Sequence, residues 1–117
     1  MSPELHISLS NLQSNIQFFQ RIIKKNTELS AVVKSDAYGL GIAKIVPEIE
    51  RNGVRSFFTA NISEAIKVRE FSRNSEIFTL NGFDFLKANL YLDYNVTPII
   101  NSVLEAQKFI EIFNQTQ

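Results

Sequence analysis

The sequence predicts an α/β fold in which strand–helix units repeat and the strands form a parallel sheet. Short apolar stretches alternate with amphipathic ones about every twenty residues. Residues that cap helices stand directly after these apolar stretches. The stretch at 29–33 ends in three apolar residues, as in strands buried on both faces of a parallel sheet. Strand–helix alternation implies right-handed crossovers, either in an open doubly wound sheet or in part of a barrel, and the pattern alone leaves both open.

The first unit is expected to be a short strand followed by a helix. Leu5, Ile7 and Leu9 alternate with polar residues, which is the period of a half-buried strand. His6 then falls on the polar face of that strand. Ser10 and Gln13 fit a capping box that opens the helix. The apolar stripe of this helix consists of Ile16, Phe19, Ile22 and Ile23.

Three further units follow, with strands expected at 56–60, 76–80 and 96–100. The predicted caps of the helices after them are Asn61 with Glu64, Asp84, and Ser102 with Glu105. Asn81 and Gly82 predict a turn after the second of these strands. Pro98 removes a ladder donor, so its strand should lie at an edge, start late or carry a bulge. Pro47 lies within the helical stretch 42–51 and predicts a kink or a late helix start.

Composition excludes several classes of function. With 117 residues, 44% of them hydrophobic and 21% charged, the chain reads as one soluble globular unit. Twelve basic and twelve acidic residues give no net field for nucleic acid or an anionic membrane. A chain with no cysteine and one histidine, His6, is poorly equipped for a metal site, so we expect none. Neither a signal-like start nor an apolar run of membrane-spanning length is present, and a cytoplasmic location is expected.

The segment 31–41 carries the chemistry, since it runs from a buried strand through a glycine-bearing loop into a helix. Ligands of parallel α/β folds collect at this carboxyl edge of the strands. Lys34, if partly desolvated there, could keep enough neutral amine to attack an aldehyde and form a Schiff base. Gly39 and Gly41 allow a ligand to approach the backbone, and the helix that begins near Ile42 directs its positive end toward the loop, which favours a phosphate. Taken singly, a lysine that ends a strand is usually a solvated charge.

Taken as a whole, the string Ala-Val-Val-Lys-Ser-Asp-Ala-Tyr-Gly-Leu-Gly at 31–41 resembles the pyridoxal-phosphate lysine motif of alanine racemases. Ser35 stands where alanine is common in that family, and Leu40 where many relatives have histidine. The resemblance extends over 5–15, 52–69 and 80–82 and so covers most of the chain. Only the lysine segment is specific.

This resemblance implies particular roles. Lys34 would bear pyridoxal 5'-phosphate and act as one of two opposed acid/base groups at the substrate α carbon. Tyr38 would donate a hydrogen bond to the cofactor phosphate. The implied activity is an isomerase that interconverts L- and D-alanine and supplies D-alanine for the bacterial cell wall. The full-length family enzyme is expected to be a homodimer.

The resemblance also implies that residues 1–117 form the N-terminal part of a barrel domain. A complete (β/α)8 TIM-type barrel needs about 250 residues, and these would supply its first half. The rest of the barrel and a C-terminal β domain, whose tyrosine is the second acid/base group of the partner subunit's site, are expected outside the chain. The chain alone is therefore expected to be inactive. Three alternatives remain open: a broader amino-acid racemase, a non-catalytic module that binds pyridoxal phosphate or another phosphate compound, and an inert remnant.

Overall fold

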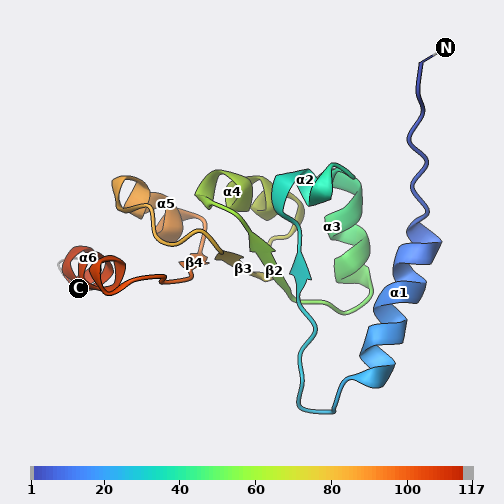
Figure 1. The fold of residues 1–117 in the computed structure, drawn as a ribbon, viewed down its shortest axis with the longest axis horizontal. Helices are drawn as coiled ribbons and strands as arrows, with labels where there is room; N and C mark the ends of the chain where they lie inside the picture. Colours follow the sequence, from blue (N-terminus) through green and yellow to red (C-terminus); the bar gives the residue numbers. More distant parts are fainter. Residues whose placement is uncertain (1, 115–117) are drawn as a thin grey trace.

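The computed structural model describes residues 2–114 and shows helices alternating with parallel strands (Figure 1). In chain order the elements are α1 (Leu9–Ile22), β1 (Ala31–Val32), α2 (Lys34–Tyr38), α3 (Ile42–Arg51), β2 (Ser56–Thr59), α4 (Ile62–Phe71), β3 (Glu76–Thr79), a 3-10 helix (Phe85–Lys87), α5 (Ala88–Asp93), β4 (Val96–Pro98) and α6 (Val103–Asn114). The strands form one sheet in the order β1-β2-β3-β4, and each neighbouring pair is parallel. The predicted fold class is confirmed.

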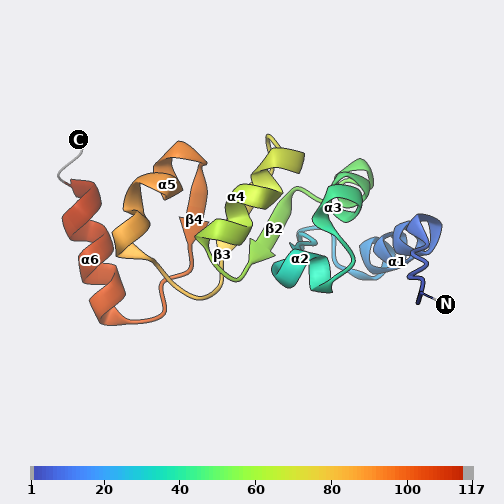
Figure 2. The ribbon, with the colours of Figure 1, turned by 90° about the horizontal axis from the view of Figure 1, so that it is seen from above.

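The core lies between one face of the sheet and the helices that cover it. Viewed from above, the helices follow one another along the sheet (Figure 2). On the covered face the strands contribute Phe57, Ile77 and Val96, all buried. The matching apolar stripes on α3 and α4 are Ile42, Ile45, Val46 and Ile49, and Ile62, Ala65 and Val68. Burial of these side chains stabilises the unit by about 1.5 to 3 kcal/mol for each large residue.

The opposite face of the sheet is open and carries a row of side chains in register. Val32 pairs with Phe58, Phe58 with Phe78, and Phe78 with Thr97. The rings of Phe58 and Phe78 stack with centroids 4.8 Å apart, whereas Val32 is 45% exposed. Such an apolar row is typical of a sheet face that packs against further structure.

The caps predicted for the later helices are confirmed. Asn61 Oδ1 accepts a hydrogen bond from the Glu64 N–H at 3.0 Å, and Ser102 Oγ accepts one from the Glu105 N–H at 3.1 Å. Asp84 Oδ1 accepts the Leu86 N–H at 3.2 Å and so begins the 3-10 helix that leads into α5. The carboxyl ends of β2, β3 and β4 therefore each pass into a helix through a polar cap, whereas the Val33 cap of α2 after β1 makes no side-chain hydrogen bond.

The predicted N-terminal strand is wrong. Residues 2–8 have no regular structure and extend away from the sheet (Figure 1). Leu5 is 69% exposed, since none of the described strands lies beside it to complete a ladder. The helix begins at Leu9 rather than after Ser10, and its cap is Ser8, whose Oγ accepts the Asn11 N–H at 3.2 Å.

The two prolines that interrupt the pattern have different outcomes. β4 is an edge strand among the described residues, so Pro98 needs no donor on its outer side, as the first of the three alternatives predicts. Pro47 lies inside α3, which begins at Ile42, so the late helix start is wrong. The Pro47 ring nitrogen only removes one donor from a helix that core contacts of Ile45, Val46 and Ile49 hold in place.

Arg69 links the amino ends of β3 and β4 through hydrogen bonds. Its guanidinium donates hydrogen bonds to five backbone carbonyls, at 2.7 to 3.3 Å. They belong to Ser72, Arg73, Ser75, Tyr94 and Asn95. Burial lowers the pKa of Arg69, and the nearby Glu50 carboxylate opposes that shift. The same carboxylate accepts the hydroxyls of Ser72 and Ser75.

Arg69→Met should therefore lower the free energy of unfolding by about 3 kcal/mol, because several carbonyls lose a charged donor together. The free energy of unfolding of Arg69→Lys should lie between those of Arg69→Met and the unmodified chain. An ammonium keeps the charge but cannot donate to five acceptors at once. Urea unfolding with a matched Arg73→Met control, an exposed position, measures both. Equal midpoints for the Arg69 and Arg73 variants would contradict this role.

Candidate functional site

Lys34 stands at the carboxyl edge of the sheet, one residue after the last β1 ladder bond. The Val33 N–H donates to the Phe58 carbonyl at 2.9 Å, which ties this end of β1 to β2. The Lys34 side chain is half-buried, and its Nζ lies 6.0 Å from the centre of the Tyr38 ring. The structure thus places both predicted site residues together on α2.

The segment after Lys34 differs from the glycine-bearing loop that the sequence predicts. Four consecutive non-glycine residues, from Ser35 to Tyr38, have φ between 53° and 56°, so α2 is a left-handed turn. Left-handed backbone costs about 1 to 2 kcal/mol for each residue with a Cβ. Gly39 and Gly41 follow at φ 84° and 95°, where glycine is unstrained. Strain of this kind persists only where surrounding contacts hold the backbone.

Two carboxylates supply such contacts. Glu64 accepts the Ser35 N–H at 2.7 Å through Oε2 and the Ala60 N–H at 2.8 Å through Oε1. Asp36 Oδ1 accepts the Ile42 N–H, the first of α3, at 3.0 Å. Buried Ala37 anchors the middle of the turn in the core. The sequence pattern identified Glu64 only as a helix cap, and Asp36 only as part of the family string.

The Asp36 contact corrects one expectation about phosphate. The amino end of α3 was expected to favour a phosphate, but its first N–H is already taken by the Asp36 carboxylate. A carboxylate there satisfies the helix end and repels a second anion. The Ile42 N–H is therefore not free to bind a phosphate at this helix end.

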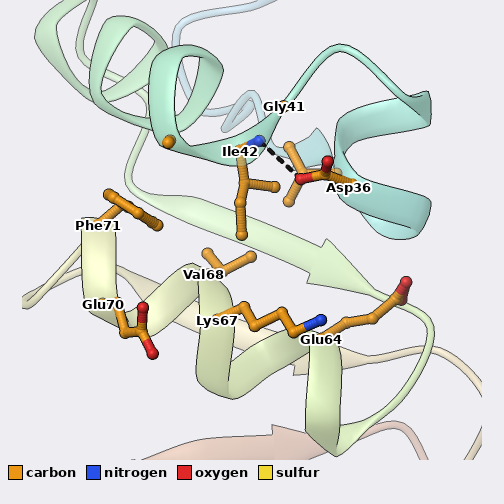
Figure 3. A pocket seen from close by; sticks show the side chains of 10 residues that line it. Asp36, Gly41, Ile42, Glu64, Lys67, Val68, Glu70 and Phe71 are labelled. Atoms are coloured by element: carbon orange, nitrogen blue, oxygen red, sulfur yellow. Dashed lines mark hydrogen bonds between the residues drawn. The ribbon is translucent and has the colours of Figure 1, made fainter.

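A hollow of about 560 Å³ lies on the helical side of the turn, between α3 and α4 (Figure 3). Its floor is apolar and includes Val33, Ile42 and Val68, while Asp36 and Glu64 stand in its wall. Lys34 and Tyr38 are not among its lining residues. This hollow is therefore the outer side of the turn rather than the predicted cofactor site.

The described part of the chain contains neither a cluster of metal ligands nor a helix suited to span a membrane. Within residues 2–114 no group of three or more His, Cys, Asp or Glu side chains converges to hold a metal ion. His6 is exposed and contacts Glu4 at 3.1 Å. In the same range, no helix is both long and apolar enough for a membrane span.

A parallel α/β sheet with a lysine held at its carboxyl edge defines a class of ligand-binding α/β domains. Comparison with known proteins narrows this class. The family model "Alanine racemase, N-terminal domain" matches residues 7–117. The chain belongs to the alanine racemase family, as the motif at 31–41 predicted.

Individual relatives agree with this assignment. An alanine racemase of Cereibacter sphaeroides is 32% identical over 108 residues, which cover 92% of this chain and 31% of that protein. An amino-acid racemase of Enterococcus faecalis is 35% identical over 96 residues, covering 82% of this chain and 14% of that protein. The crystal structure of alanine racemase from Bartonella henselae with covalently bound pyridoxal phosphate aligns with a TM-score of 0.87 and 31% identity, over 94% of this chain and 31% of that one. The chain spans less than a third of the length of each of these proteins.

Proposed function

We propose that residues 1–117 form the N-terminal part of the barrel domain of a pyridoxal-phosphate-dependent alanine racemase. The observation that carries the proposal is Lys34, half-buried at the carboxyl edge of the sheet and followed by a turn that two carboxylates hold. The B. henselae relative, 31% identical, holds pyridoxal phosphate covalently. The rest of the barrel and a C-terminal β domain belong to this proposal and come from outside the chain.

The residues at this edge fit the cofactor. Lys34 offers an amine and Tyr38 a phenolic hydroxyl, and the Nζ of one lies 6.0 Å from the ring of the other. Tyr38 is 62% exposed, so its hydroxyl has room for an anionic partner. Lys34 would hold the cofactor covalently through Nζ, and Tyr38 would donate a hydrogen bond to the phosphate. When bound, pyridoxal phosphate acts as an electron sink that makes the α proton of the amino acid acidic.

Within this proposal the Lys34 amine would also serve as an acid/base group. The free amine accepts or returns a proton at one face of the α carbon. Inversion needs a second group at the opposite face, and the resemblance assigns that task to a tyrosine of the C-terminal domain. The backbone bonds on both sides of Lys34 limit where its Nζ can reach, which a positioned acid/base requires.

The proposal includes a homodimer of the full-length enzyme. The helical segments that follow β3 and β4 leave large apolar side chains uncovered, among them Leu86 of the 3-10 helix at 85% and Val103 of α6 at 75% exposed. Exposed large apolar side chains are available for contact with a further domain or subunit, which is consistent with the homodimer in this proposal. The cytoplasmic location expected from the sequence is likewise part of the proposal.

Tyr38→Phe should weaken cofactor retention about 10- to 100-fold while changing the chemical step less, because one hydrogen bond to a charged phosphate is lost. The effect is measured by equilibrium dialysis against decreasing cofactor, with this chain built into a complete racemase. Tyr94→Phe, on α5's carboxyl end, is the matched control. Retention unchanged in Tyr38→Phe would count against the phosphate role.

The function itself is tested in a chimera in which this chain replaces the aligned segment of the B. henselae enzyme. The expected result is cofactor-dependent conversion of L-alanine to D-alanine. Assays with other amino acids separate an alanine racemase from a broader amino-acid racemase. A folded chimera that binds the cofactor and racemises no amino acid would favour a non-catalytic binding module.

A further inference from the structure

Lys34 lies between two backbone anchors of different kinds. On its amino side, the Val33 N–H donates to Phe58 of the neighbouring strand at 2.9 Å. On its carboxyl side, the Ser35 N–H donates to the Glu64 carboxylate at 2.7 Å. The direction of the Lys34 Cα–Cβ bond follows from the peptide planes on both sides, so Glu64 contributes as directly as the sheet does.

The second oxygen of Glu64 makes this anchor rigid. Oε1 accepts the Ala60 N–H at 2.8 Å, directly after β2, and the Glu64 N–H is itself capped by Asn61. One carboxylate therefore joins the turn after β1 to the turn after β2, across a sequence separation of 29 residues. Hydrogen bonds to an ionised acceptor are about twice as strong as neutral ones.

The Ser35–Glu64 hydrogen bond lies at the start of the strained backbone segment. Ser35 is the first of the four consecutive non-glycine residues with left-handed φ. Without an acceptor for its N–H, the Ser35 peptide could rotate toward an unstrained conformation and carry Lys34 with it. Glu64 thus holds the strained conformation at the point where it begins.

We propose that Glu64 is a positioning residue for the cofactor lysine, acting through the Ser35 peptide. The inference rests on the proposed function of Lys34 and assigns Glu64 no contact with substrate or cofactor. Its consequence is that removal of the carboxylate charge should slow capture of pyridoxal phosphate by Lys34 while the fold is kept.

Glu105 provides a matched control. It occupies the same position after its own cap, Ser102, and its Oε2 accepts the Asn101 N–H at 2.7 Å, four residues earlier, as Glu64 does with Ala60. Among the described residues, Glu105 makes no hydrogen bond to the Lys34 turn. Glu64→Gln and Glu105→Gln therefore remove the same kind of cap, and only the first loosens the turn.

Two measurements on the purified chain test the proposal. Amide hydrogen exchange followed by NMR should show exchange at Ser35 about tenfold or more faster in Glu64→Gln, and unchanged at Ser35 in Glu105→Gln. Trapping with pyridoxal phosphate and borohydride should be about tenfold slower at Lys34 in Glu64→Gln, and within about twofold of the unmodified chain in Glu105→Gln.

The outcomes separate this inference from the proposed function. Unchanged Ser35 exchange in Glu64→Gln, or an equal loss of trapping in both variants, would overturn the positioning role. If the unmodified chain shows no preference for Lys34, the proposed function fails. Faster Ser35 exchange in Glu64→Gln would then still show that Glu64 holds the turn, and unchanged exchange would refute that as well.

Discussion

Lys34→Ala in the chimeric enzyme is expected to reduce alanine racemisation to the background of free cofactor. The lost proton transfer alone accounts for about 10²- to 10⁴-fold in rate, or about 3 to 5 kcal/mol of transition-state stabilisation. The lost covalent attachment adds to this effect, because Lys34 is the residue proposed to hold the cofactor. The measurement is the initial rate of D-alanine formation at saturating cofactor.

The control for this variant is Lys67→Ala, which removes an exposed lysine of α4 that lines the hollow behind the turn. Racemisation by this variant should stay within about twofold of the chimera, as for most surface substitutions. A Lys34→Ala chimera that retains a tenth or more of the rate would show that another group performs the proton transfer.

The 117-residue chain alone is expected not to racemise alanine. In the proposed function Lys34 would serve one face of the α carbon, and the resemblance places the opposed tyrosine in a domain that these residues do not include. A missing acid/base group lowers the rate by about 10²- to 10⁴-fold before any loss of cofactor affinity is added. The residual rate should be close to that of free pyridoxal phosphate.

The assay is deuterium exchange at the α carbon together with inversion of L-alanine, run with purified chain and added cofactor. The chain with Lys34→Ala serves as its control. Turnover well above that control would show that the chain completes a competent site, for example by self-association across the open sheet face that carries Phe58 and Phe78.

Periodicity sufficed for the strand–helix units because the apolar side chains that pack the core recur locally. The cap pairs Asn61 with Glu64 and Ser102 with Glu105 are likewise local and were found from spacing alone. Pro98 limited its strand to an edge, a late start or a bulge because its missing donor is a property of the residue itself, and the structure shows the edge. The alternation of Leu5, Ile7 and Leu9, by contrast, specifies a strand only if a partner strand lies beside it.

The left-handed turn could not be predicted from its own residues. Ser35, Ala37 and Tyr38 have no preference for positive φ, and glycine stands only after the turn, at Gly39. The conformation depends on Glu64, which is distant in the sequence, and on the Asp36 bond to α3. The pattern therefore singled out Lys34, the proposed cofactor lysine, whereas the contacts that hold its turn emerged only from the tertiary structure.

The central claim, that Lys34 captures pyridoxal phosphate, is tested most directly by the site of attachment. The purified chain is incubated with limiting cofactor, reduced with borohydride and mapped by peptide mass spectrometry. We expect the label predominantly on Lys34, the half-buried lysine at the sheet edge. A label spread over exposed lysines such as Lys24 and Lys67 without preference for Lys34 would contradict the claim.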